Sequence, residues 1–220
     1  HLQTLRSLAS LDTAHDSTLD DLVRVAAHAF HCPIALISLV GADRQWFKAS
    51  FGPVPPHGAT CLPLCAQALQ YNEVFVVSDA SLVPQYADLP LVKGPMGVRF
   101  YAGVSLRVDG HKVGTLGVLD HKPRALDADE RTLLVDLAHA VEHWFSSRRR
   151  QMQLAQRESE FRQLAEQMPG IVYRAALDDA SSTLYVSPRV RDLGFTPEQW
   201  MAQPDAWLQA LHPQDRDRVL

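Results

Sequence analysis

The clearest pattern of hydrophobic and polar positions lies in residues 100–119. From residue 100 to residue 108 every even position is apolar, which is the two-residue period of a β-strand. Asp109 and Gly110 follow and suit a tight turn, because glycine takes a positive φ without steric cost. Residues 112–119 return as a second strand, so the pattern predicts a β-hairpin.

Four positions of this hairpin carry little side-chain bulk: Ala102, Gly103, Gly114 and Gly117. Small residues inside strands indicate that another group approaches the backbone closely. Two alternatives stay open for that group: a helix packed tightly on one face of the sheet, or a small ligand over the other face.

The residues before the hairpin predict one helix and three further strands. Residues 19–30 have apolar positions at helical spacing, and Ser17 is the expected N-cap of this helix. Residues 34–40 are almost continuously apolar, so this strand is expected to be covered on both faces, and residues 73–78 form a third strand. In strand 45–51, strict alternation puts two sets of side chains on opposite faces, with Trp46, Lys48 and Ser50 on one face and Phe47, Ala49 and Phe51 on the other.

The stretches on either side of strand 73–78 suggest a pocket with a lid. A short helix is expected within residues 61–69, with Pro63 near its start. Residues 79–98 carry three prolines and two glycines, and connecting segments of this length are often functional lids. A lid over the open face of the sheet would close a pocket, and Asp79 is placed to cap the turn that begins it.

The chain changes character after residue 120. No proline or glycine occurs between Ala125 and Met168, which predicts one long helix or two helices joined without a loop, capped by Asp127 or Asp129. Heptad positions 134, 141, 148 and 155 are Leu, Val, Arg and Ala. We predict that this helix forms a parallel homodimer and carries a signal between modules. A short lead-in helix is predicted for residues 1–16.

The densest part of the chain resembles the GAF domain of bacterial signalling proteins, from about residue 19 to residue 141. The resemblance is carried by Pro90-Leu91-Val92, by Gly94-Pro95, by residues 98–103 and 113–120, and by Lys122-Pro123-Arg124. It implies an α+β fold, with a GAF-type antiparallel sheet, helices on both faces and a domain over residues 17–145. GAF pockets bind very different molecules or none, so the resemblance names no ligand.

Residues 158–220 resemble the first part of a PAS domain. The matching residues are 169–174, 185–188, 194–200 and 212–216. The resemblance implies a helical linker over residues 146–160 and a partial PAS fold over residues 161–220, whose two strands lack their usual partners. His212 and Asp215 could be a metal or acid–base pair, but beside Pro213 a helix-start role is favoured.

Composition narrows the kinds of function. The net charge of −4 does not favour a nucleic-acid partner. Three cysteines are too few for a disulfide framework, which favours a reducing, cytoplasmic compartment, and no apolar run is long enough to cross a membrane. The chain begins with His1, so we expect it to be part of a longer protein.

The candidate ligand-binding residues are Trp46, Cys65, Asp79, Arg99 and Tyr101. Arg99 could meet an anionic group of a ligand, or pair with Asp79 or Asp88 to hold the lid. The spacing of Cys61 and Cys65 leaves three alternatives: buried packing thiols, a redox function and, least favoured, a zinc site. No catalytic or metal-binding residue is assigned, and the cofactor is unknown.

Comparison with other GAF subgroups narrows the ligand classes. Cys65 is followed by Ala66 rather than histidine, which disfavours covalent attachment of a bilin. The histidines on helices are expected to be ordinary surface or capping residues rather than haem ligands, and the cyclic-nucleotide signature of the family is missing from residues 91–120. An apolar ligand, or no ligand, is therefore favoured.

The sequence predicts a sensory or dimerisation module for a separate output domain of the diguanylate cyclase or histidine kinase type. The alternatives are a thiol-dependent redox enzyme or redox sensor, and a structural dimeriser whose pocket is closed.

Overall fold

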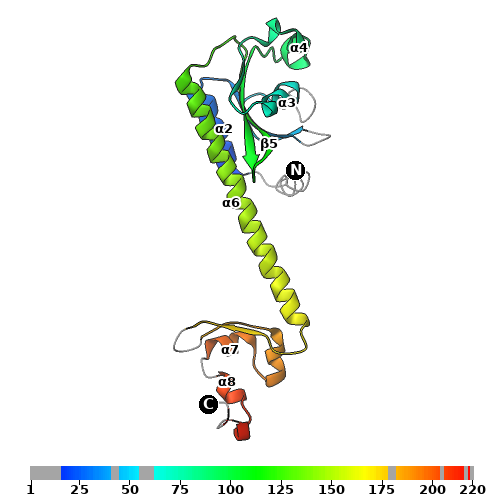
Figure 1. Cartoon of the computed structure of the whole chain (residues 1–220), viewed down its shortest axis with the longest axis vertical. Helices are drawn as coiled ribbons and strands as arrows, with labels where there is room; N and C mark the ends of the chain where they lie inside the picture. The colour runs from blue at the N-terminus through cyan, green and yellow to red at the C-terminus, as the bar shows by residue number, and fades with distance from the viewer. Residues whose placement is uncertain are drawn as a thin grey trace. The chain divides into compact units, whose positions relative to one another are not determined.

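The computed structural model describes residues 16–40, 45–54, 62–177, 182–203, 206–215 and 218 (Figure 1). The chain divides into two compact units, residues 1–150 and 151–220, and each is described by itself. The predicted lead-in helix and Cys61 lie outside the described residues, except that Asp16 is described.

The first unit is built on an open five-stranded antiparallel sheet with the strand order β2-β1-β5-β4-β3. Its strands are β1 (Ile34–Val40), β2 (Gln45–Phe51), β3 (Phe75–Val77), β4 (Phe100–Val108) and β5 (His111–Asp120). Helices lie on both sides of the sheet, with α2 and α6 on one side and α3 and α4 on the other (Figure 1). The predicted α+β class is confirmed.

The predicted hairpin forms from β4 and β5. Asp109 and Gly110 make the turn with φ values of 50° and 76°. Further along, the register shifts between Leu106 and Arg107, so that one residue of β5 has no counterpart in β4. As a result Gly103 pairs with Gly117, and the two glycines stand directly opposite each other.

The first face of the sheet is covered by α2 (Ser17–Ala29) and by the first part of α6 (Ala128–Gln167). The N-cap of α2 is Asp16 rather than Ser17, and its carboxylate accepts a hydrogen bond from the amide of Thr18 at 3.0 Å. Ser17 is already helical, so the predicted capping residue was wrong by one position.

The helix α6 is continuous over 40 residues, as the lack of Pro and Gly predicts. At its start Asp127 and Glu130 exchange hydrogen bonds, each carboxylate accepting from the other residue's amide, at 2.8 and 3.0 Å. Leu134 and Val141, two positions of the predicted heptad seam, are fully buried within the first unit. They therefore belong to the unit's own core and are not available to a partner helix.

The alternation predicted for β2 was wrong. The pairing of β1 with β2 shifts register between Ile37 and Ser38, which leaves Lys48 as an extra residue in β2. On either side of the extra residue, Trp46 and Ala49 both face α2 and α6, whereas Phe47 packs on the opposite face.

The second face of the sheet is covered by short helices, listed here with their bounds: α3 (Leu62–Gln70), η1 (Ala80–Leu82), α4 (Pro84–Ala87) and α5 (Pro90–Lys93). The last three of them lie in residues 79–98, which we call the lid. The lid is therefore folded into helical turns rather than an irregular loop. Its buried residues Tyr86, Leu91 and Val98 join the apolar cluster on this face of the sheet.

The second unit pairs two short strands and packs small helices beside them. Its elements after α6 are β6 (Tyr173–Ala175), β7 (Thr183–Val186), η2 (Pro188–Leu193), α7 (Pro197–Ala202), α8 (Ala206–Ala210) and η3 (Pro213–Asp215). Val186, Val190 and Trp200 form a small core. Tyr173 and Leu184 are more than half exposed, at 67% and 54%, so the described residues leave part of the strand pair uncovered.

The ends of these small helices follow local rules. Thr196 and Gln199 form a reciprocal capping box at the start of α7. Close to η3, His212 accepts a hydrogen bond from the amide of Gln214 at 3.3 Å, and Asp215 pairs with Arg218 at 2.8 Å. His212 and Asp215 therefore act on local backbone and charge, in agreement with the predicted helix-start role.

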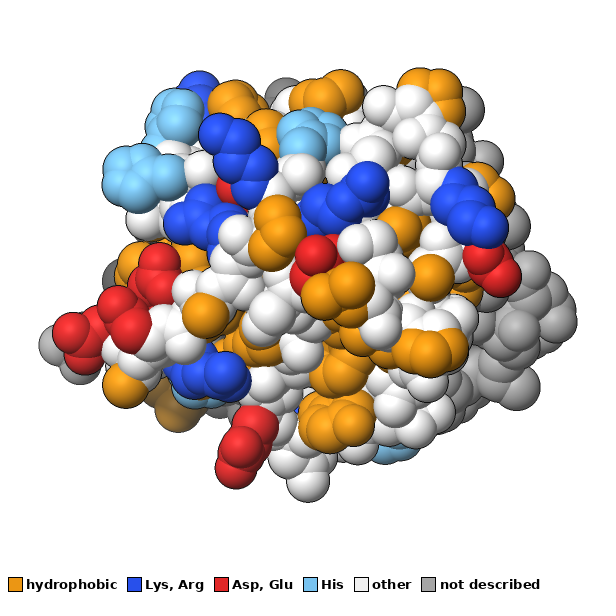
Figure 2. All heavy atoms as spheres, turned by 90° about the horizontal axis from the view of Figure 1, so that it is seen from above, with side chains coloured by type: hydrophobic (Ala, Val, Ile, Leu, Met, Phe, Trp, Pro, Cys, Tyr) orange, Lys and Arg blue, Asp and Glu red, His pale blue; other side chains and the backbone are white. Residues whose placement is uncertain are grey.

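The described surface is mixed in character. Seen from above, side chains of Lys, Arg and His gather on one part of the face, with Asp and Glu side chains beside them (Figure 2). Neither sign of charge covers this face. Among the helices of the described ranges, none combines the length and the apolar character needed to cross a membrane.

Candidate ligand site beneath the lid

The centre of the lid face is occupied by the Tyr101 side chain, which is fully buried. Its ring lies across the two facing glycines of the hairpin. A methyl group built on Gly103 would lie 2.3 Å from the Tyr101 hydroxyl oxygen and 2.7 Å from Cζ, and one on Gly117 would lie 3.2 Å from Cε2. The group that approaches the glycines is therefore the chain's own tyrosine, an alternative that the sequence analysis did not include.

The helix α3 lies over the same place and brings Cys65 to Tyr101. The tyrosine hydroxyl donates to the Cys65 sulfur at 3.7 Å, and both side chains are fully buried. The ring of Phe75 stands beside the tyrosine ring, with centroids 6.1 Å apart. Two of the predicted ligand-binding residues, Cys65 and Tyr101, are thus in direct contact.

Asp79 and Arg99 hold the two ends of the lid. The Asp79 carboxylate caps η1, accepting from the amide of Ser81 at 3.0 Å and from its hydroxyl at 2.6 Å. The hydroxyl hydrogen bond lowers the pKa of Asp79, with smaller help from the Ser81 amide and the charge of Arg99. The amide of Ala80 donates to the Arg99 carbonyl at 2.6 Å, which joins the start of the lid to the residue just after its end.

The Arg99 side chain holds the lid through backbone carbonyls. Its guanidinium donates to the Val92 carbonyl at 3.0 Å and to the Val98 carbonyl at 3.2 Å. Among the described residues, Asp88 pairs with Lys93 at 2.5 Å instead of with Arg99. Arg99 thus fulfils the predicted lid-holding role, but with different partners from the two carboxylates that were expected.

Trp46 is not brought together with the other predicted residues. It is 7% exposed and belongs to the core between the sheet and the helices α2 and α6. The bulge in β2 turns its side chain to this face, so the four remaining candidates share the lid side without it.

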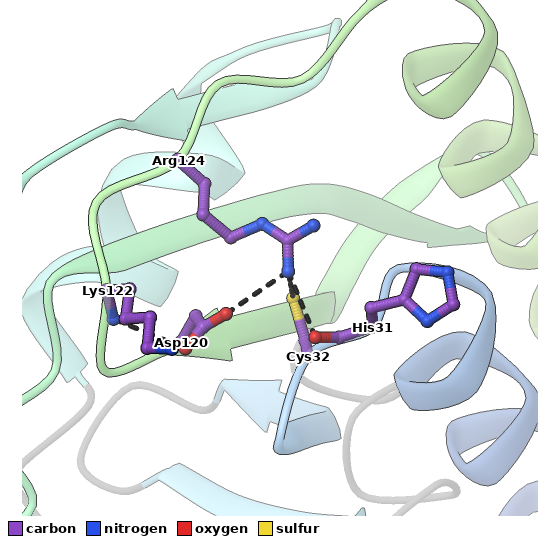
Figure 3. Close-up of polar contacts among 5 residues, drawn as sticks. All are labelled: His31, Cys32, Asp120, Lys122 and Arg124. Atoms are coloured by element: carbon purple, nitrogen blue, oxygen red, sulfur yellow. Dashed lines mark hydrogen bonds and ion pairs between the residues drawn. The ribbon is translucent and has the colours of Figure 1, made fainter.

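A second polar cluster links three segments at the end of β5 (Figure 3). One nitrogen of the Arg124 guanidinium donates to Asp120 at 3.1 Å, to the His31 carbonyl at 3.0 Å and to the Cys32 sulfur at 3.5 Å. The Arg124 amide also donates to the Ser78 carbonyl at 3.0 Å. This arginine therefore ties together the end of α2, the end of β5 and the segment after β3.

Burial makes the Cys32 thiol in this cluster a poor nucleophile. It raises the pKa of Cys32 to about 11, although the nearby Arg124 charge opposes the rise. An open groove of about 670 Å³ runs past the cluster and is lined by Ala27, His28, His31, Cys32, Pro33, Asp120 and Lys122. No group of three or more His, Cys, Asp or Glu side chains suited to a metal occurs among the described residues.

Two features of these sites were missed from the sequence. The pairing of Gly103 with Gly117 depends on the bulge, because a plain two-residue turn would place Gly103 opposite Leu116. The role of Arg124 was not assigned, although Lys122-Pro123-Arg124 was part of the family resemblance. The position of Arg124 shortly after the strand β5 was the feature of the sequence that could have indicated this role.

The fold and site define a class: a sheet with two long helices on one face and a lidded core on the other. Residues 15–143 match the family described as GAF domain. The chain therefore belongs to the GAF domain family.

The chain is also similar in sequence to a known bacterial protein. A cyclic di-GMP phosphodiesterase of Pseudomonas aeruginosa is 35% identical over 130 residues, which are 59% of this chain and 22% of that protein. The chain thus matches about a fifth of its relative's length.

Solved structures show the same fold at low sequence identity. A domain of a two-component sensor histidine kinase from Sinorhizobium meliloti has a TM-score of 0.51 and 16% identity, covering 66% of this chain and 99% of that one. A free methionine-R-sulfoxide reductase from Neisseria meningitidis has a TM-score of 0.52 and 20% identity, and the match covers 68% of this chain and 89% of that one. The GAF domain of an Acinetobacter phosphoenolpyruvate-protein phosphotransferase has a TM-score of 0.51 and 22% identity, and the match covers 66% of this chain and 92% of that one.

Proposed function

We propose that this chain is the sensory and relay part of a bacterial signalling protein and is not itself an enzyme. The observation that carries the proposal is the helix α6. Its first part completes the core of the GAF domain, through fully buried side chains such as Val141 and Phe145, and it continues without a break to Gln167. A change in the GAF core would therefore alter the position of a rigid element that leaves the domain.

The output would be a separate domain of the same protein. The Pseudomonas relative is named a cyclic di-GMP phosphodiesterase, and the matched region is a minor part of it. The name of this relative supports an output domain that degrades cyclic di-GMP, and the diguanylate cyclase and histidine kinase types expected from the sequence are the alternatives. We place the module in the cytoplasm, with no nucleic-acid partner.

We propose that the second unit is the first part of a PAS domain. Its support is the paired strands β6 and β7, the capped helix α7 and a small core around Trp200. A cavity of about 350 Å³ beside the strands is lined by Tyr173, Ala175, Thr183, Trp200 and Trp207. An apolar cavity of this kind suits further strands of the same domain.

The homodimer is proposed to use a different face of α6 from the heptad seam suggested by the sequence. Leu133 is 38% exposed on α6 and Val25 is 49% exposed on α2, while Leu137 and Trp144 are partly buried. A second copy would cover these apolar positions and leave Leu134 in the core. Leu133→Glu should weaken the dimer, whereas Gln153→Glu, at an exposed position of the same helix, is the matched control and should not.

The alternative of a thiol-dependent redox function finds little support in the described cysteines. Cys32 and Cys65 are buried, and the raised pKa of Cys32 keeps its thiol protonated at neutral pH. Cys61 lies outside the described residues. Thiol titration of the folded protein tests this alternative, because a redox role requires at least one fast-reacting thiol.

The first test of the proposed function is native mass spectrometry of the purified chain, compared with its mass after denaturation. We expect the mass of two chains. Any extra mass that is lost on denaturation would identify a bound small molecule, which would support sensing, whereas its absence would favour relay alone. A monomer at tens of micromolar would contradict the dimeric relay.

A further inference from the structure

The space that Tyr101 fills has the shape of a slot for a flat ring. Its floor is the pair of facing glycines: the ring lies closer to Gly103 than a side chain there would allow, and at Gly117 a side chain would be in tight contact with the ring. Its roof is α3, with Leu64, Cys65 and Ala68 fully buried. A residue larger than glycine at position 103 would leave too little height for the ring.

The slot lies within a mainly apolar cluster of side chains. The surrounding cluster includes Leu91, Leu119 and Phe75, and the described contact to the tyrosine hydroxyl is the Cys65 sulfur, a weak acceptor. Arg99 directs its guanidinium to backbone carbonyls of the lid. A charged ligand would lose its hydration on entering this mainly apolar cluster, which is costly.

We propose that Tyr101 is a built-in occupant of the ligand position of this domain, and that the slot takes a neutral, flat aromatic ring carrying a hydroxyl-type donor. Naming the slot a ligand position rests on the proposed sensory function. A small molecule of this class binds only when the Tyr101 ring leaves, so the wild-type domain is closed to it by its own side chain.

Chemical rescue can test whether the slot binds a phenol ring that is not attached to the chain. Tyr101→Ala removes the phenol ring and keeps Cβ, so phenol, which reproduces the missing group, is the probe. We expect this probe to bind the variant with a Kd on the order of 1 mM or tighter. At about ten times its Kd it should raise the Tm of the variant by roughly 3 °C or more, because binding stabilises the folded state.

Three controls make the result specific to the slot. The wild type and Tyr101→Phe keep the slot filled, so phenol should leave their Tm unchanged. In Tyr101→Ala combined with Gly103→Val, the new side chain takes up the floor and the shift should disappear. Cyclohexanol carries the same hydroxyl group but is not flat, and it should shift the Tm of Tyr101→Ala by less than half as much.

Each outcome decides the proposal. A folded Tyr101→Ala variant without a shift overturns it, and equal shifts from the flat and the non-flat probe overturn the ligand class. If the variant does not fold alone, refolding from urea with phenol should recover folded protein, and failure to do so also overturns the proposal. A failed rescue together with an intact dimer would reject the slot and leave the proposed function standing.

Discussion

Replacing Gly103 with alanine is the most direct probe of the ring's position. In the native structure the added methyl group would lie 2.3 Å from the Tyr101 hydroxyl oxygen, 2.7 Å from Cζ and 2.9 Å from Cε1. Real contacts of this kind are not shorter than 3.0 Å, so the ring or the strand must move. Gly103→Ala should therefore destabilise the first unit.

The expected cost follows from two opposing effects. Overpacking a well-packed core costs about 1–3 kcal/mol. Alanine restricts the unfolded chain more than glycine does, which returns about 0.4–1 kcal/mol. The free energy of unfolding should fall by roughly 1–2 kcal/mol. Gly117→Ala should cost less, because its methyl group would approach the ring only to 3.2 Å.

The same substitution should lose its effect once the ring is gone. Tyr101→Ala itself should lower the free energy of unfolding by about 3–5 kcal/mol. When Gly103→Ala is added to this variant, the second substitution should be neutral or slightly stabilising. In the Tyr101→Phe background, two ring carbons still lie within 3.0 Å of the methyl group, so most of the cost should remain. Gly170→Ala is the control, since no other atom lies within 4 Å of its methyl group.

Urea unfolding of the four proteins in this cycle gives the coupling energy between positions 101 and 103. A coupling of about 1–3 kcal/mol is expected for residues in such close contact. Additive effects, within about 0.5 kcal/mol, would show that the ring does not lie on Gly103. A similar cost for Gly103→Ala in the Tyr101→Ala background would lead to the same conclusion.

Three further predictions concern the polar groups of the first unit. Ser38→Ala should lower the free energy of unfolding by about 1–3 kcal/mol, because the Ser38 and Thr115 hydroxyl oxygens are 2.9 Å apart and the substitution leaves the buried Thr115 hydroxyl without this partner. Adding Thr115→Val should recover most of that loss in urea unfolding. Arg124→Met should lower the free energy of unfolding by about 2–3 kcal/mol. Its control, Arg24→Met, breaks an exposed ion pair and should lower it by no more than about 0.5 kcal/mol. Equal losses would count against the linking role of Arg124. Burial raises the pKa of the folded Cys32 thiol from its ordinary value of 9.0 to about 11, so the thiol of the unfolded chain ionises first and stability is lost as pH rises through this interval. Relative to Cys32→Ala, the wild type should lose stability between pH 9 and pH 11 and show no such difference below pH 8, and parallel profiles over the whole range would refute the assignment.

The elements of the first unit were predictable because their signals are local. The alternation in residues 100–108 with the Asp109-Gly110 turn predicted the hairpin, and the lack of Pro and Gly after residue 125 predicted α6. Asp79 was expected to cap a turn, and it does. Each of these signals depends on backbone propensities within a few residues of the position concerned.

The site was predictable only in part. Cys65 and Tyr101 were chosen from the sequence, and the structure places them in contact. Trp46 was chosen with them but faces the other side, because one extra residue in β2 reverses the alternation. The preference for Leu134 in a dimer seam failed for a related reason, since helical spacing does not show which stripe the domain itself buries.

By itself the sequence determined the types of the main elements, the family, and the presence of small residues in the central hairpin. Only the tertiary structure decided what lies against those small residues. A bulge between Leu106 and Arg107 shifts the register by one residue and brings Gly103 opposite Gly117. The bare patch formed there accepts the Tyr101 ring from the same strand. Register depends on pairing between strands, so no pattern along a single strand contains it.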